Sequence, residues 1–235
     1  DKNSKIKEGE NEAKLTSAKE EKKTFTREEV ISSIEKIKKE LNLDIEFEVY
    51  ETGEVRFLLD TKKKLEQVYK ILTHPENKIQ KINFCVCGIG LEGAKIIAEA
   101  LTNKNNKIES INLERNELKK EGAEIIAKAL IHPNNKVVEI NLSDNKLDSE
   151  GGKKIFEALK DRINCKVKRI KLYHNYFGKN KEITSLIINA LKTSKVESID
   201  LRWNDFTPDQ IKELQNFLNT LKETKREIEI IFGEA

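Results

Sequence analysis

A twelve-residue pattern recurs five times beyond residue 77 and limits the folds open to this chain. The copies begin at residues 78, 107, 136, 166 and 195 and read KIQKINFCVCGI, KIESINLERNEL, KVVEINLSDNKL, KVKRIKLYHNYF and KVESIDLRWNDF. Their first apolar residues are 29, 29, 30 and 29 residues apart. A fixed period of this length indicates a repeat protein, in which each unit packs only against its neighbours.

Each copy is followed by an apolar run at helical spacing. The clearest runs are EGAKIIAEAL (92–101), EGAEIIAKAL (121–130) and EGGKKIFEAL (150–159). Within a copy, apolar Ile111 and Leu113 alternate with polar residues, which is typical of a strand with one buried face. The repeating unit is therefore predicted to be a strand, a turn and a helix.

Two less regular segments extend this array. Residues 226–232 (REIEIIF) are in phase with the strands, and residues 61–75 resemble the helix of a degenerate first repeat. We therefore predict an array over residues 61–235 with about six strand positions.

The segment before the array has a different composition. Residues 1–25 mix Lys, Glu, Asn and Ser with few apolar residues, which predicts a disordered tail. Thr26 and Glu29 form a capping-box pattern before a helical run, and two alternating stretches around ETG predict a hairpin. Residues 26–60 are thus predicted to form a helix-plus-hairpin cap.

The pattern L-x-x-L-x-L-x-x-N-x-L, followed by E-G-A and an apolar helix, is similar to the ribonuclease-inhibitor subfamily of leucine-rich repeats. The resemblance covers residues 55–232. It implies an α/β solenoid bent into a horseshoe arc, with parallel strands on the concave face and helices on the convex face. It also implies a buried asparagine ladder where the chain leaves each strand. The ladder positions are Cys87, Asn116, Asn145, Asn175 and Asn204.

Proteins of this subfamily usually bind a protein partner through outward strand residues, so the resemblance implies the same here. The candidate partner-binding residues are Glu114, Asp144, Arg169, Lys171, Tyr173, His174, Asp200, Arg202 and Trp203. Trp, Tyr and Arg are enriched among binding hot spots, which favours the last two copies. Alternatively, Trp203 and Tyr173 only pack over the turn edge.

Catalytic and metal chemistry find little support in the sequence. His74 and His132 occupy equivalent inter-repeat loops, and His174 near Asp144 and Glu114 lacks a plausible nucleophile. Cys85 and Cys87 have the spacing of a metal clip but no second Cys or His pair. We predict a non-enzymatic protein with no metal and no cofactor.

The charge balance and the cysteine content bear on the kind of partner and on the cellular compartment. The chain has 44 Lys and Arg residues against 41 Asp and Glu residues, and both signs are interleaved, so a nucleic-acid partner is not expected. A minor alternative is that Arg169, Lys171 and Arg202 bind a nucleic-acid backbone. Three cysteines without framework spacing indicate a reducing, cytoplasmic compartment. No apolar run approaches a membrane span, and we expect a monomer.

Two further hypotheses rest on analogy. A GTPase-activating family carries repeats of this subtype, but with a longer array and an acidic tract that this chain lacks. The abundance of Lys, Ile, Asn and Glu suggests an AT-rich intracellular bacterium or protist, and bacterial proteins with such repeats resemble secreted effectors that engage host proteins. Because the chain starts at Asp1 and contains no Met, we expect that an upstream segment has been removed.

Overall fold

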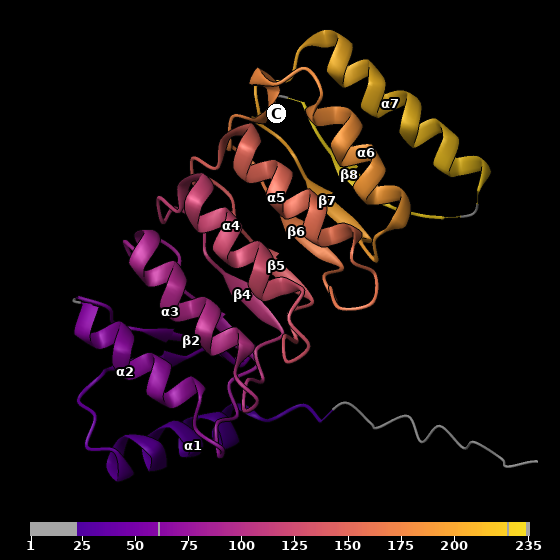
Figure 1. Ribbon diagram of the computed structural model, residues 1–235. Coiled ribbons are helices and arrows are strands. Elements are labelled where there is room, and N and C mark those ends of the chain that lie inside the picture. The colour runs from indigo at the N-terminus through magenta and orange to yellow at the C-terminus, as the bar shows by residue number, and fades with distance from the viewer. Residues whose placement is uncertain (1–22, 61, 225, 234–235) are drawn as a thin grey trace, which may run out of the picture.

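The computed structural model describes residues 23–60, 62–224 and 226–233. Within these residues the strands form one eight-stranded sheet whose spatial order is the chain order. Figure 1 shows the units stacked side by side, with helices α2 to α7 covering one face of the sheet. In chain order the elements are α1 (Arg27–Glu40), β1 (Phe47–Val49), β2 (Glu54–Phe57), α2 (Lys62–Leu72), β3 (Lys81–Asn83), α3 (Gly90–Thr102), β4 (Ser110–Asn112), α4 (Lys119–Leu130), β5 (Glu139–Asn141), α5 (Asp148–Lys160), β6 (Arg169–Lys171), the 3-10 helix η1 (Phe177–Lys179), α6 (Ile183–Thr193), β7 (Ser198–Asp200), α7 (Pro208–Glu223) and β8 (Glu229–Ile231).

The register of the sheet follows the sequence repeat. β2 to β8 are parallel, and each central isoleucine pairs with the isoleucine of the next copy, as Ile111 does with Ile140. Parallel pairing requires a crossover between strands, and the helix of each unit provides it. The predicted fold is confirmed: the chain is an α/β leucine-rich-repeat solenoid, with strands on the concave face and helices on the convex face.

The core lies between the sheet and the helices. Inward strand residues such as Ile111 and Leu113 are at most 1% exposed, and so are Ala123 and Ile126 of the facing helix α4. Alanine at this place lets helix and strand layers approach closely. Since neighbouring units repeat this arrangement, the cores of the units merge into one continuous interior.

The N-terminal end closes the stack with a different structure. Helix α1 starts with Thr26 and Glu29 in a capping box and packs against α2 and β1. β1 pairs antiparallel with β2. Of the predicted tail, residues 1–22 lie outside the described residues. Phe25 packs against the core, its N–H donates to Gln80 Oε1 at 3.1 Å, and Gln80 Nε2 donates to the Lys23 carbonyl at 2.9 Å, so described structure extends three residues into that segment.

The fourth unit departs from the others after its strand. Its predicted helix start is replaced by η1, and α6 begins only at Ile183. Gly178 in η1 lies against the backbone of the next unit, where a Cβ would be 2.0 Å from the Asp205 carbonyl oxygen. The change of sequence from glycine to Lys181 at the usual helix start thus coincides with a local change of repeat geometry.

Candidate functional site

The turns after the strands are held by a buried ladder of Asn116, Asn145, Asn175 and Asn204. Each ladder asparagine is at most 1% exposed. The Oδ1 atom of Asn145 accepts from the N–H groups of Asn116 (3.0 Å) and Leu118 (3.3 Å) in the preceding unit. Its Nδ2 donates to the carbonyl of Leu113 at 2.8 Å. One amide therefore links two consecutive turns and fixes the residues that follow each strand.

Cys87 occupies the first ladder position but makes different bonds. Its N–H donates to Asn116 Oδ1 at 3.0 Å, so it receives support from the next unit. Its thiol packs against the core and, among the described residues, hydrogen-bonds only to the Cys85 carbonyl, at 3.5 Å, and burial raises the pKa of this thiol. The hydrogen-bonding side chains of the ladder therefore end at Asn116.

A second asparagine column, at the opposite end of the strands, was missed by the sequence analysis. Asn77, Asn106 and Asn135 are at most 1% exposed. Each donates to the last carbonyl region of its helix, as Asn106 does to Leu101 O at 2.9 Å, and accepts from an N–H two residues on. The signal was present as an Asn-Lys pair before each of the first three strands. Both ends of these strands are thus rigid.

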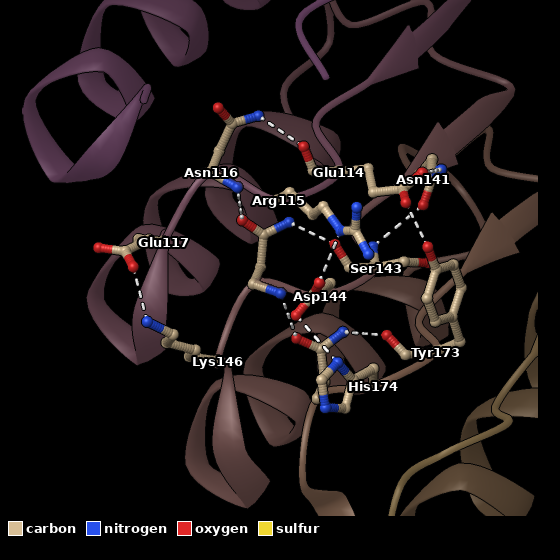
Figure 2. A network of polar contacts seen from close by, with 12 residues as sticks. Glu114, Arg115, Asn116, Glu117, Asn141, Ser143, Asp144, Lys146, Tyr173 and His174 are labelled. Carbon is tan, nitrogen blue, oxygen red and sulfur yellow. Dashed lines mark hydrogen bonds and ion pairs between the residues drawn. The ribbon is translucent and has the colours of Figure 1, made fainter. Parts of the chain in front are cut away.

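The concave face carries a polar bridge across three units. Tyr173 donates its hydroxyl to Glu114 Oε1, and Asn141 Nδ2 donates to Glu114 Oε2 at 3.0 Å. Figure 2 shows these side chains converging on Glu114. Burial, followed by the bond to Glu114, raises the pKa of Tyr173 to about 12. Ser143, between them, is fully buried, and its Oγ has no partner among the described residues.

A second cluster lies beside this bridge, at the turn positions. Asp144 accepts from Arg115 Nε at 2.8 Å, and His174 Nδ1 lies 3.0 Å from its other oxygen. Arg115, Asp144 and His174 have left-handed φ angles of 56°, 52° and 55°, which aim their side chains over the edge of the sheet. We call Glu114, Arg115, Asn141, Asp144, Tyr173 and His174 together the concave network.

The remaining candidates are not joined to the concave network. Arg169 pairs with Glu139 of the preceding unit. Arg202 binds both oxygens of the nearly buried Asp200, at 3.0 and 2.7 Å. Lys171 is exposed, and the described part of the chain offers its ammonium group no hydrogen bond or ion pair.

Trp203 stands apart from these ion pairs. Its side chain is 47% exposed, and it lines a shallow hollow together with Phe206 and Ile211. A neighbouring aromatic residue that was not predicted, Tyr176, contacts the His174 ring at 5.0 Å and lies under Lys179 at 5.4 Å. The aromatic character of this edge therefore extends beyond Trp203.

The two other histidines of the chain bond within inter-repeat loops. The ring Nδ1 atoms of His74 and His132 accept from backbone N–H groups two residues on, both at 3.2 Å, so they stabilise equivalent loops. No group of three or more His, Cys, Asp or Glu residues in the described ranges is placed to hold a metal ion. None of the described helices is long and apolar enough to cross a membrane.

The stacked units and the asparagine ladder define a leucine-rich-repeat fold. The family model described as Leucine Rich repeat matches residues 104–127 and 134–156, which are two adjacent units. Among solved structures, the chain is similar to the leucine-rich repeat-containing protein LegL7 from Legionella pneumophila, at 16% identity and a TM-score of 0.43. The match covers 72% of this chain and 60% of that protein. A comparison with curated proteins finds no match.

Proposed function

We propose that the chain binds a protein partner through the concave face and its C-terminal turn edge. The observation that carries this proposal is the contrast between neutralised and free groups there. Glu114, Asp144 and Asp200 are already bonded within the chain, whereas Lys171 is unpaired among the described residues and Trp203 is half-exposed. A free cation on β6 and an exposed Trp on the turn after β7 suit an acidic or aromatic surface of a partner.

The rigid setting of these residues supports recognition. The concave network is fixed by bonds that cross units, and ladder amides hold the turns from which His174 and Trp203 project. Such pre-organisation lowers the entropy lost on binding.

The test compares pull-downs from cell lysate with wild-type chain, a Lys171→Glu, Trp203→Ala double variant and a Lys153→Glu control. Lys153 is an exposed residue of the convex helix α5, so this control reverses a charge on the opposite face. We expect the double variant to lose a partner that both others retain, while its melting temperature stays close to that of the wild type. Equal recovery by all three proteins would refute the assignment of this face.

We propose further that the repeats belong to the ribonuclease-inhibitor subtype, supported by the period of 29 to 30 residues and a full helix in most units. We also propose that the chain is a monomer. A reducing compartment is proposed for the cysteines, since burial raises the pKa of all three thiols and leaves them poorly reactive. The effector and GTPase-regulator hypotheses stay predictions.

A further inference from the structure

The end of the ladder leaves a groove at the N-terminal end of the solenoid. In the later units an asparagine amide binds the preceding turn, but Cys87 offers no such amide to residues 58–60. A hollow of about 640 Å³ lies between this segment, the β1 region and the turn at Val86. A second hollow of about 310 Å³ shares Leu59, Asp60 and Cys87 with it, so the two are adjacent. We call the two hollows together the N-terminal groove.

The rim of the N-terminal groove carries a strained apolar residue. Val86 has a φ of 57°, a left-handed conformation in which a β-branched side chain is an outlier. Its side chain is 64% exposed, so no packing compensates for the strain. The equivalent residues Arg115, Asp144 and His174 have the same backbone conformation but make polar contacts. The conformation belongs to the repeat turn, in which the Val86 N–H donates to the Glu114 carbonyl at 3.0 Å, so what distinguishes this unit is an exposed aliphatic side chain where the other units carry polar or aromatic ones.

A second apolar residue faces the same groove. Leu58, from the segment after β2, is 52% exposed and lines the hollow together with Val86. Two large aliphatic side chains are thus exposed at one cavity, one unit before Glu114 and Arg115 of the concave network, with the Val86 N–H donating to the Glu114 carbonyl at 3.0 Å. This surface has the apolar character of a docking site rather than of a solvated edge.

The charges around the N-terminal groove indicate what it would accept. Glu46 and Asp60 line it, and neither carboxylate has a hydrogen bond or ion pair among the residues described. Of the cations that line it, Lys64 lies 2.9 Å from Asp44, and Tyr50 raises the pKa of the Arg56 guanidinium. Lys62 is exposed and has no hydrogen bond or ion pair among the described residues, so two carboxylates and one ammonium group are left free at the groove and the free charge is negative on balance.

We propose that the N-terminal groove docks a segment of a partner protein in which an aliphatic or aromatic side chain is flanked by Lys or Arg. The apolar side chain covers Leu58 and Val86, and the flanking cations pair with Glu46 and Asp60. Lys171 and Trp203, on which the proposed function rests, lie toward the other end of the sheet. The N-terminal groove gives the solenoid a second contact of opposite chemistry.

The test is a titration of the ¹⁵N-labelled chain with the capped synthetic peptide KKLFKK, with EELFEE as its charge-reversed counterpart. We expect KKLFKK to shift the amide signals of Leu58, Leu59, Val86 and Cys87, and EELFEE to bind about ten-fold more weakly. Failure of KKLFKK to shift these signals, or equal binding of the two peptides, overturns the proposal.

Val86→Asn separates docking from folding, because asparagine tolerates the left-handed conformation better than valine. We expect this variant to melt at a higher temperature than the wild type and to bind KKLFKK about ten-fold more weakly. The matched control is Ile163→Asn, which removes an aliphatic side chain that is 86% exposed elsewhere and should leave peptide binding unchanged. Unchanged binding by Val86→Asn would overturn the proposal.

Two further measurements distinguish the occupant and the site. The Lys171→Glu variant should bind KKLFKK as the wild type does, so failure of the concave-face proposal would not affect this result. Self-association that disappears in Val86→Asn would assign the groove to a second copy of the chain and overturn the peptide proposal.

Discussion

Replacement of a central ladder residue should cost far more stability than its single side chain suggests. In Asn145→Ala, the N–H groups of Asn116 and Leu118 lose their acceptor, and both residues are buried. The three carbonyls that Asn145 binds keep other donors: Leu113 O is bonded by Asn116, Leu142 O by Asn175 and Ser143 O by the Arg115 N–H. The main cost is therefore two unsatisfied buried donors, at about 1–3 kcal/mol each, or about 4 kcal/mol together.

Equilibrium urea unfolding followed by circular dichroism measures this loss. The matched control is Cys87→Ala in the same column, where the thiol leaves no backbone N–H without its acceptor, and we expect a loss below about 1 kcal/mol. A loss for Asn145→Ala within about 1 kcal/mol of the control would refute the reasoning, because it would mean that the turns hold without the shared amide.

Two other predictions test the contacts between units. Gly178→Ala should lower the free energy of unfolding by more than about 3 kcal/mol, because its Cβ would lie 2.0 Å from a backbone oxygen. In the control Gly53→Ala nothing lies within 4 Å of the added Cβ, so left-handed strain should lower the free energy of unfolding by only about 1 kcal/mol. Similar losses in both variants would contradict this reasoning. Tyr173 has its pKa raised to about 12 from 10.0, so the stability it adds is complete below pH 10 and is lost as the pH rises toward 12. The tyrosinate difference spectrum between the wild type and Tyr173→Phe measures this titration, and Glu114→Gln should move it toward lower pH; no movement would show that Glu114 does not hold the phenol.

The sequence predicted the architecture because the fold is encoded locally and repeated. One strand with inward Ile111 and Leu113 is ambiguous, but five copies in register allow a single stacked solution. The ladder positions followed from the family resemblance, and Asn116, Asn145, Asn175 and Asn204 lie as that resemblance implies. The candidate partner-binding residues stay predictions, although their geometry is now known.

The remaining features depend on contacts that no single repeat encodes. Tyr173 and Glu114 are 59 residues apart, and their bond follows from the side-by-side arrangement of three units. The grouping of Arg169, Lys171 and Arg202 suggested a basic patch, but Glu139 and Asp200 neutralise the two arginines. The strain at Val86 is a backbone property, and its side chain alone gave no reason to expect a left-handed conformation.

The pairing of charges between units explains why the net charge says little about recognition. Arg115 with Asp144, Lys146 with Glu117 and Lys168 with Glu197 each join adjacent units. Exposed pairs of this kind add little stability, but they remove most of the local field of the groups they join. The two proposals rest on charged groups that are not paired in this way. These are Lys171 toward the C-terminal end of the sheet, and Glu46 and Asp60 at the N-terminal end. On the two proposals together, a partner that covers both surfaces presents an anion to one and a cation to the other, so it would bind the solenoid in only one direction.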